Sequence, residues 1–396
     1  MPPVDVHPAV PVLVIAFLVC GLAGIIVSRS RFYDALISQE IRAKRFHSID
    51  GLRGYLALGV LFHHVVINYH YYQTGVWELT PSRLNTFLGR GSVAWFFMVT
   101  AFLFWNRAIA AKGKIDVSKF YVSRLRRMVP MYLLSAGLVV VTALAFTHFR
   151  LLESPLELLR HITAWMFFTI PGVPNINTFS QTPLINTVFW SLVYEWKFYF
   201  LFPLLSIFAY ARGRWCLAAL AALYIYLYSE TQVEWFFFAG CAAAILTRAP
   251  QVRKIAISWI GAVIAIAFIA ATLEWQPAIY SLIGAALLSI PFIVFASGNT
   301  MFGLLTCRPA RLLGMLSYSI YLLHNWVLYL VSRCVNHYSS ISFLPAHSYW
   351  MVGALVAMLT IACAALTYRF VEYPFLRTDN RKELELLTHP SGIATE

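Results

Sequence analysis

Residues 47–69 read HSIDGLRGYLALGVLFHHVVINY, a long apolar run that also carries ionisable side chains. A helix that crosses a bilayer needs about 20 mostly apolar residues, and residues 52–71 meet that requirement. Ionisable groups inside such a helix are energetically costly and by default mark functional sites. Here they include Arg53, His63 and His64. The segment therefore predicts a membrane-spanning helix that carries chemistry.

The rest of the chain has the same apolar character. Of its 396 residues 60% are hydrophobic and only 12% are charged, against about 25% charged in soluble proteins. This composition excludes a disordered chain, a disulfide scaffold and an ordinary cytosolic enzyme. We predict an all-α polytopic membrane protein of about eleven transmembrane helices. The other ten segments are 9–28, 91–110, 129–147, 187–209, 214–229, 233–248, 256–274, 278–297, 312–332 and 349–368.

The basic residues predict the orientation of these helices. Cytoplasmic loops of membrane proteins are rich in Lys and Arg. With the N-terminus outside and the C-terminus cytoplasmic, the segments assigned to the inside hold 23 of the 30 Lys and Arg residues and the outside segments hold 5. The net charge of +13 is thus explained by topology, and no nucleic-acid partner is expected. The six cysteines are scattered without metal-ligand spacing, so no metal is expected either.

The spacing of Arg53 and His64 places the two side chains on one helix face at different depths in the membrane. Eleven residues place them within about 20° of a common helix face and roughly 16 Å apart along the axis, whereas His63 points about 80° away. An arginine at the cytoplasmic mouth and an imidazole deeper in the membrane suit a charged cytoplasmic cofactor with a buried reactive end. Alternatively, Arg53 is a topological anchor and the histidines make core hydrogen bonds.

Three further groups of ionisable side chains are candidates for a site. Arg124 and Arg127 are three residues apart on one helix face, where they would grip phosphates or, alternatively, lipid head groups. Glu195 is expected to face the interior and to pair with Arg53, a histidine or Lys197. His324 lies inside a predicted span, where a lone histidine is usually structural.

Two other segments have a predicted role. Arg369 and Glu372 are expected to pair and close the final helix. The long external loop 148–186 contains an amphipathic stretch at 156–170, which we expect to be interfacial or re-entrant. Its polar and aromatic side chains form a candidate acceptor surface made of Trp165, Asn175, Asn177 and Gln181.

Six blocks, in this order, resemble the acyltransferase-3 family of integral membrane acyltransferases. They are SIDGLRGYLALGVLFHH (48–64), VAWFFMVTAFLF (93–104), FYVSRLRRMVPMY (120–132), FWSLVYEWKFY (189–199), SYSIYLLH (317–324) and RFVEYPF (369–375). The family's Arg-x10-His pair falls on Arg53 and His64, whereas Thr100-Ala101 stands where the family usually has Ser-Gly.

The resemblance implies that the chain is divided into three parts. Residues 1–45 would form an additional N-terminal transmembrane helix and a basic cytoplasmic linker. Residues 46–376 would form the family's ten-helix membrane domain, and residues 377–396 a cytoplasmic polar tail. The expected location is the cytoplasmic (inner) membrane of a bacterium.

The resemblance also implies transfer of an acyl group, with acetyl expected, from cytoplasmic acyl-CoA to a hydroxyl of an extracytoplasmic glycan. Arg53, Arg124 and Arg127 would bind the CoA phosphates. His64 would act as general base, assisted by Glu195, with His63 and His324 as further catalytic candidates. Direct attack by the acceptor and an acyl-histidine intermediate both remain open.

The alternative function is a transporter or flippase of a lipid-linked glycan, which would also need polar residues between its helices. Such proteins usually show internal repeats and broken helix pairs, and the sequence shows neither. A family member that has lost catalysis is a second alternative, although Arg53, His64 and Glu195 are all present.

Overall fold

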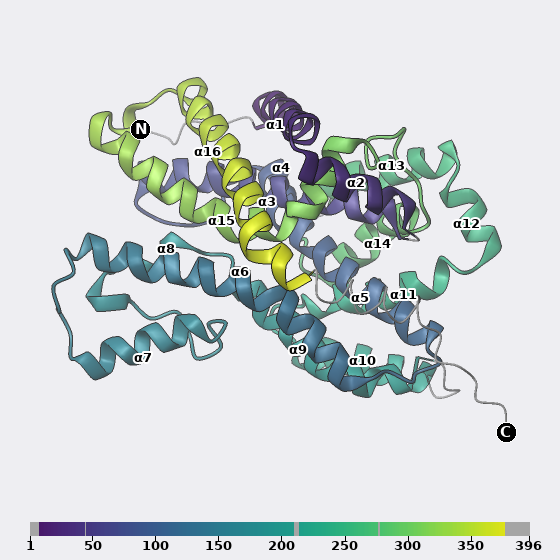
Figure 1. Cartoon of the computed structure of the whole chain (residues 1–396). Helices are drawn as coiled ribbons and strands as arrows, with labels where there is room; N and C mark the ends of the chain where they lie inside the picture. Colours follow the sequence, from purple (N-terminus) through teal and green to yellow (C-terminus); the bar gives the residue numbers. More distant parts are fainter. Residues whose placement is uncertain (1–7, 44, 210–213, 276–277, 377–396) are drawn as a thin grey trace.

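The computed structural model describes residues 8–43, 45–209, 214–275 and 278–376, which form helices joined by loops with no β-strand (Figure 1). The all-α prediction is therefore confirmed for this part of the chain. The predicted tail at 377–396 lies outside the described residues.

The helices follow the order of the predicted segments. They are α1 (Ala9–Arg29), α2 (Arg31–Arg42), α3 (His47–Thr74), α4 (Arg83–Thr86), η1 (Phe87–Gly91), α5 (Ser92–Ala110), α6 (Val117–Phe146), α7 (Pro155–Met166), η2 (Ile176–Thr178), α8 (Thr182–Ile185), α9 (Trp190–Ile207), α10 (Arg214–Tyr228), α11 (Glu234–Leu246), α12 (Pro250–Ala256), α13 (Trp259–Trp275), α14 (Leu282–Ala296), α15 (Arg308–Tyr338), η3 (Ile341–Phe343), α16 (Ala346–Thr367) and η4 (Tyr368–Glu372). Each of the eleven predicted spans overlaps one of these helices.

Four helical stretches among the described residues are long and apolar enough to cross a membrane: Ala9–Arg29, Arg83–Ala110, Val117–Phe146 and Ala346–Leu376. The pair α12 and α13, bent by 78°, would make a fifth. Helices α3 and α15 are longer than most, at 28 and 31 residues, but polar side chains lower their hydropathy. Eleven crossings and the orientation of the chain ends therefore remain predictions.

Several predicted boundaries differ from the structure, most of all the start of the span at 129–147. The span expected at 129–147 begins twelve residues earlier, because α6 starts at Val117 and continues through Pro130. The amphipathic stretch expected at 156–170 forms α7, a helix of 12 residues that is too short to cross a bilayer. Ser154 caps α7, accepting a hydrogen bond from the Glu157 amide.

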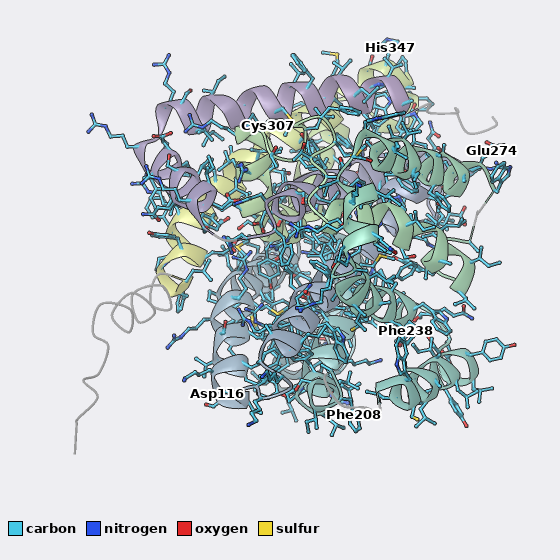
Figure 2. All side chains as sticks on the ribbon, turned by 90° about the vertical axis from the view of Figure 1, so that its right-hand side faces the viewer. Asp116, Phe208, Phe238, Glu274, Cys307 and His347 are labelled. Atoms are coloured by element: carbon cyan, nitrogen blue, oxygen red, sulfur yellow. The ribbon has the colours of Figure 1, made fainter. Side chains whose placement is uncertain are left out.

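Helix α1 lies along one edge of the bundle, where it packs against α15 and α16 (Figure 1 and Figure 2). Its outward face exposes Val10, Leu13 and Phe17, as expected of a helix in contact with lipid. Figure 2 also places Asp116, which precedes α6, and Glu274, near the end of α13, at opposite edges of the molecule.

The centre of the fold is the contact between α3 and α15, where glycines let the two backbones approach closely. A methyl group added to Gly314 would lie 1.8 Å from the carbonyl oxygen of Asp50, and one added to Gly51 would lie 1.9 Å from that of Leu305, which shortly precedes α15. Gly54 is also packed against α15. Small residues serve this purpose in membrane helix pairs generally.

We expect Gly314→Ala to lower the thermal unfolding midpoint of the detergent-purified protein, because the added methyl must push α15 away from α3. Overpacking of this kind typically costs about 1–3 kcal/mol. Gly137→Ala on α6 is the matched control, since nothing lies within 4 Å of the added methyl. Equal midpoints for the two variants would show that the close contact does not limit stability.

Candidate active site

Helices α3 and α15 bring two histidines into direct contact. His64 Nδ1 lies 3.0 Å from His324 Nε2, and the ring centroids are 5.1 Å apart. His324 is fully buried and His64 is partly buried. The sequence placed both residues in spans but did not pair them.

Two backbone carbonyls decide which ring nitrogens carry protons. His324 Nδ1 faces the carbonyl oxygen of Ile320 at 3.1 Å, and a carbonyl can only accept, so Nδ1 carries the hydrogen and Nε2 of the neutral ring has a lone pair. His64 Nδ1 likewise faces the carbonyl of Val60 at 3.0 Å. Its single N–H is therefore shared between the Val60 carbonyl and His324 Nε2, and we assign an unprotonated Nε2 to neutral His64.

The unprotonated nitrogen of His64 has a hydroxyl in front of it. Thr187 Oγ1 lies 3.3 Å from His64 Nε2. Both residues line a cavity of about 320 Å³, called here the histidine cavity, together with Trp77, Arg90 and Tyr321. The Trp77 ring stacks on His64 with centroids 6.1 Å apart. A lone pair that already meets a hydroxyl in a cavity is the arrangement required of a general base.

His63 also lines this cavity, but its ring is held by the neighbouring segment. Its Nδ1 lies 2.8 Å from the carbonyl oxygen of Asn85. Gly89 passes so close that an added methyl group would lie 2.3 Å from the His63 ring. His63 thus joins α3 to the segment that precedes α5, and it contacts His64 at 5.1 Å between centroids.

Glu195 lies in a separate hydrogen-bonded group. Thr100 donates a hydrogen bond to its carboxylate over 3.2 Å, and so does the hydroxyl of Tyr199. Among the described residues no hydrogen bond joins Glu195 to a histidine or to Lys197, which stands over the Tyr194 ring instead. Of the expected partners, Arg53 is the one within electrostatic reach.

The predicted arginines gather near Glu195. Arg53 is in electrostatic reach of Arg127 as well as of Glu195, and Arg124 of both Arg127 and Glu195. The Arg53 guanidinium makes no hydrogen bond with any residue that the structure describes. Arg124 stacks on Phe104, and its Nε is buried without a partner. This cluster has unused guanidinium donors, which suit an anion.

The expected pair of Arg369 and Glu372 does not form. Glu372 instead reaches Arg127 at 3.9 Å and accepts a hydrogen bond from Ser319. Arg369 stands over the Phe32 ring, 5.1 Å from its centroid. Both residues belong to η4, a π-helical turn. Its wider winding removes the alignment of residues three apart that the prediction assumed.

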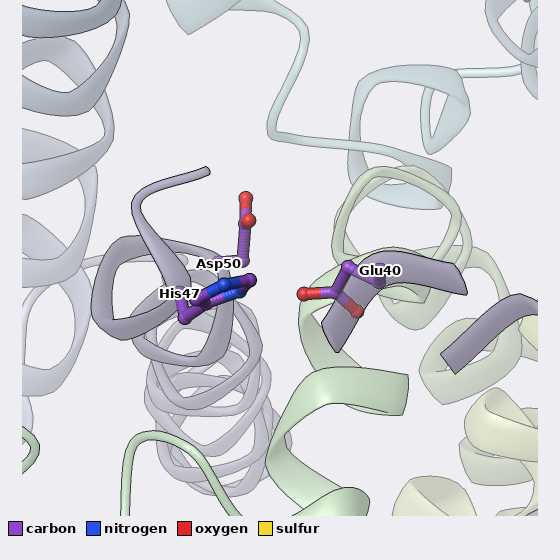
Figure 3. A group of neighbouring side chains, drawn as sticks. All are labelled: Glu40, His47 and Asp50. Atoms are coloured by element: carbon purple, nitrogen blue, oxygen red, sulfur yellow. The ribbon is translucent and has the colours of Figure 1, made fainter. Parts of the chain in front are cut away.

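Figure 3 shows Glu40 of α2 beside His47 and Asp50 at the start of α3, with potential ligand atoms within 4.8 Å of one another. Arg311 of α15 reaches Glu40 at 3.4 Å and donates to His47 Nδ1 over 3.0 Å. Burial and the nearby Asp50 raise the pKa of the Glu40 carboxyl, and Arg311 opposes this. Because the guanidinium already supplies the positive charge, we assign no metal ion to this group.

The external loop differs from the expected acceptor surface. Trp165 and Asn177 are buried: Trp165 donates to the carbonyl oxygen of Pro174, and Asn177 donates to Thr147 and to the carbonyl of Arg150. They hold the loop together. Of the four candidates, Asn175 is exposed and Gln181 lines a cavity.

Thr187 and Trp77 were not identified from the sequence. Neither sits in a pattern that points to a site: Thr187 belongs to a Pro- and Asn-rich loop, and Trp77 follows the end of α3. Each lies beside His64 only because of long-range packing.

Comparison with known proteins identifies the family of this chain. The model of the acyltransferase-3 family, described as an acyltransferase domain, matches residues 46–369. The O-acetyltransferase OatA of Staphylococcus aureus strain NCTC 8325 / PS 47 is 24% identical over 386 residues, which cover 87% of this chain and 59% of that protein. The peptidoglycan O-acetyltransferase OatA of Listeria monocytogenes is 24% identical over 83% of this chain and 55% of that protein.

This chain therefore covers less than two thirds of the length of these relatives. No solved structure matches the chain.

Proposed function

Because this chain belongs to the acyltransferase-3 family of membrane acyltransferases, we propose that it is an O-acyltransferase. It takes an acyl group, with acetyl expected, from acyl-CoA on the cytoplasmic side and transfers it to a glycan hydroxyl on the other side of the membrane. The observation that carries the proposal is the lone pair of His64 Nε2, oriented by His324 and directed at a hydroxyl in a cavity.

The acceptor is a hydroxyl of peptidoglycan or a related glycan. The relative from Listeria is named a peptidoglycan O-acetyltransferase. The geometry supports a hydroxyl acceptor, because the Thr187 hydroxyl already stands at hydrogen-bonding distance from His64 Nε2.

In the transfer step His64 Nε2 removes the proton of the acceptor hydroxyl while its oxygen attacks the thioester carbonyl. The tetrahedral intermediate collapses, the C–S bond breaks, and the imidazolium returns the proton to the leaving thiolate. The products are an ester and free CoA. His324 stabilises the transient imidazolium, because its Nε2 lone pair accepts the hydrogen bond from His64 Nδ1.

The acyl donor, acyl-CoA, binds to the arginine cluster near the start of α3. Arg53, Arg124 and Arg127 supply charge-assisted hydrogen bonds for the phosphates of CoA. Arg53 is the principal donor in this proposal, since it has no hydrogen bond with the described residues. Glu195, held by hydrogen bonds from Thr100 and Tyr199, lies within electrostatic reach of this cluster.

The test uses inverted membrane vesicles that contain the protein, supplied with isotope-labelled acetyl-CoA on the outside. Label is expected in the lumenal glycan fraction, and vesicles without the protein should give none. If folded protein yields no label in any glycan or lipid fraction, acyl transfer is excluded under these conditions. CoA-independent movement of a lipid-linked glycan into the lumen would then support the flippase alternative.

A further inference from the structure

A second cavity, of about 220 Å³, shares Trp77 with the histidine cavity. We call it the Arg333 pocket. Besides Trp77, it is lined by Asn68, Tyr71, Gln181, Tyr329 and Arg333. Trp77 stacks on His64, so a ligand in this pocket would lie one indole ring away from the proposed general base.

Arg333 brings a charge into this pocket that the protein does not neutralise. Its guanidinium stands over the Phe146 ring, 4.9 Å from the centroid, which holds it in place. Within the described residues no carboxylate lies within 4.0 Å of it. A partly buried guanidinium without a carboxylate has five donors suited to a planar anion such as a carboxylate.

The other walls of the pocket suit a sugar. Tyr329 donates to Gln181 Oε1 over 2.9 Å, which leaves the Gln181 amide hydrogens available as donors. Asn68 uses its amide hydrogens on Ser332 and Tyr349, which leaves its Oδ1 as an acceptor. Amide donors, an amide acceptor and aromatic faces together match the hydroxyls and the apolar face of a pyranose ring.

We propose that the Arg333 pocket binds a carboxylate-bearing sugar of the acceptor, with Arg333 holding the carboxylate by two parallel hydrogen bonds. The acceptor hydroxyl then reaches His64 past Trp77. This inference rests on the proposed function and adds to it the chemical class of the acceptor, an anionic glycan.

Binding of a matched pair of sugars tests the pocket without any transfer. The probes are the disaccharide of N-acetylglucosamine and N-acetylmuramic acid, which carries a carboxylate, and its methyl ester. Affinities are measured by calorimetry on the purified full chain in zwitterionic nanodiscs without acyl-CoA. The wild-type protein is expected to bind the acid about tenfold more tightly than the ester, as one charge-assisted contact would give.

Variants connect this preference to Arg333. Arg333→Gln should lose the preference by weakening only the binding of the acid, and Arg333→Lys should keep part of it because the charge remains. Arg160→Gln is the matched control, since Arg160 is an exposed arginine of α7 that pairs with Glu157. Equal binding of acid and ester, no binding of either, or the same losses in Arg160→Gln would overturn the proposal.

A lipid head group is the competing anion. The same measurement in nanodiscs with anionic phosphatidylglycerol separates the two sources. If the acid keeps its Arg333-dependent preference there, the pocket recognises the sugar. If anionic lipid abolishes the binding of the acid to wild type and Arg333→Gln removes that competition, Arg333 is a lipid contact and the assignment to a sugar fails. The His64-dependent transfer assay is independent of both results, so it judges the proposed function separately.

Discussion

Acyl transfer by the His64→Ala variant is expected to fall by about a thousand-fold, because the group that removes the acceptor proton is lost. A positioned general base contributes about 10²- to 10⁴-fold to such reactions. In the structure His64 is the histidine whose Nε2 faces a hydroxyl inside the cavity. The measurement is the initial rate of label transfer from acetyl-CoA in vesicles that contain equal amounts of folded protein.

His337→Ala supplies the control, since His337 is an exposed histidine at the end of α15 and should leave the rate unchanged. His324 is a positioning residue, so the activity of its variants should depend on whether the new side chain can accept a hydrogen bond. His324→Gln retains an acceptor for the His64 N–H and should keep more activity than His324→Ala, with the loss in kcat and little change in KM. Full activity in His64→Ala would refute its role as the base.

The second large effect is expected in Arg53→Gln, where the KM for acyl-CoA should rise by about ten- to a hundred-fold with a smaller change in kcat. A hydrogen bond to a charged group contributes about 1.5–3 kcal/mol, and the Arg53 guanidinium is free of hydrogen bonds to the described residues. The measurement is the initial rate of transfer as a function of acetyl-CoA concentration.

Binding of CoA can be followed independently through its effect on thermal stability. Ligand that binds the folded state raises the unfolding midpoint, so CoA should raise that of the wild type and much less that of Arg53→Gln. Arg31→Gln, in an exposed position of α2, should behave as wild type. If Arg53→Gln has the same KM and the same CoA-dependent rise in unfolding midpoint as the wild type, Arg53 does not bind the CoA phosphates.

The sequence allowed good predictions where a single helix decides the outcome. The membrane character and the helix in each predicted segment follow from apolar length, which depends on residues close together in the chain. The spacing of Arg53 and His64 along α3 follows from helix geometry alone. The structure confirms that both residues lie on one continuous helix.

Contacts between helices were harder to predict. From the sequence His324 was a catalytic candidate without a partner, and its partner is His64 because Gly54 and Gly314 bring α15 against α3. No local pattern encodes that pairing. Likewise the spacing of Arg369 and Glu372 suggested a pair, but a π-helical turn and a distant arginine prevented it.

The contact between α3 and α15 also sets when the protein becomes able to react. His64 and His324 are 260 residues apart in sequence, so at translation rates of about 5–20 residues per second the second imidazole is synthesised about 13–52 s after the first. Until then a nascent chain holds its first histidine without the second. An unfinished chain at the ribosome therefore lacks the His64–His324 contact, and the proposed active site is complete only after α15 has packed against α3.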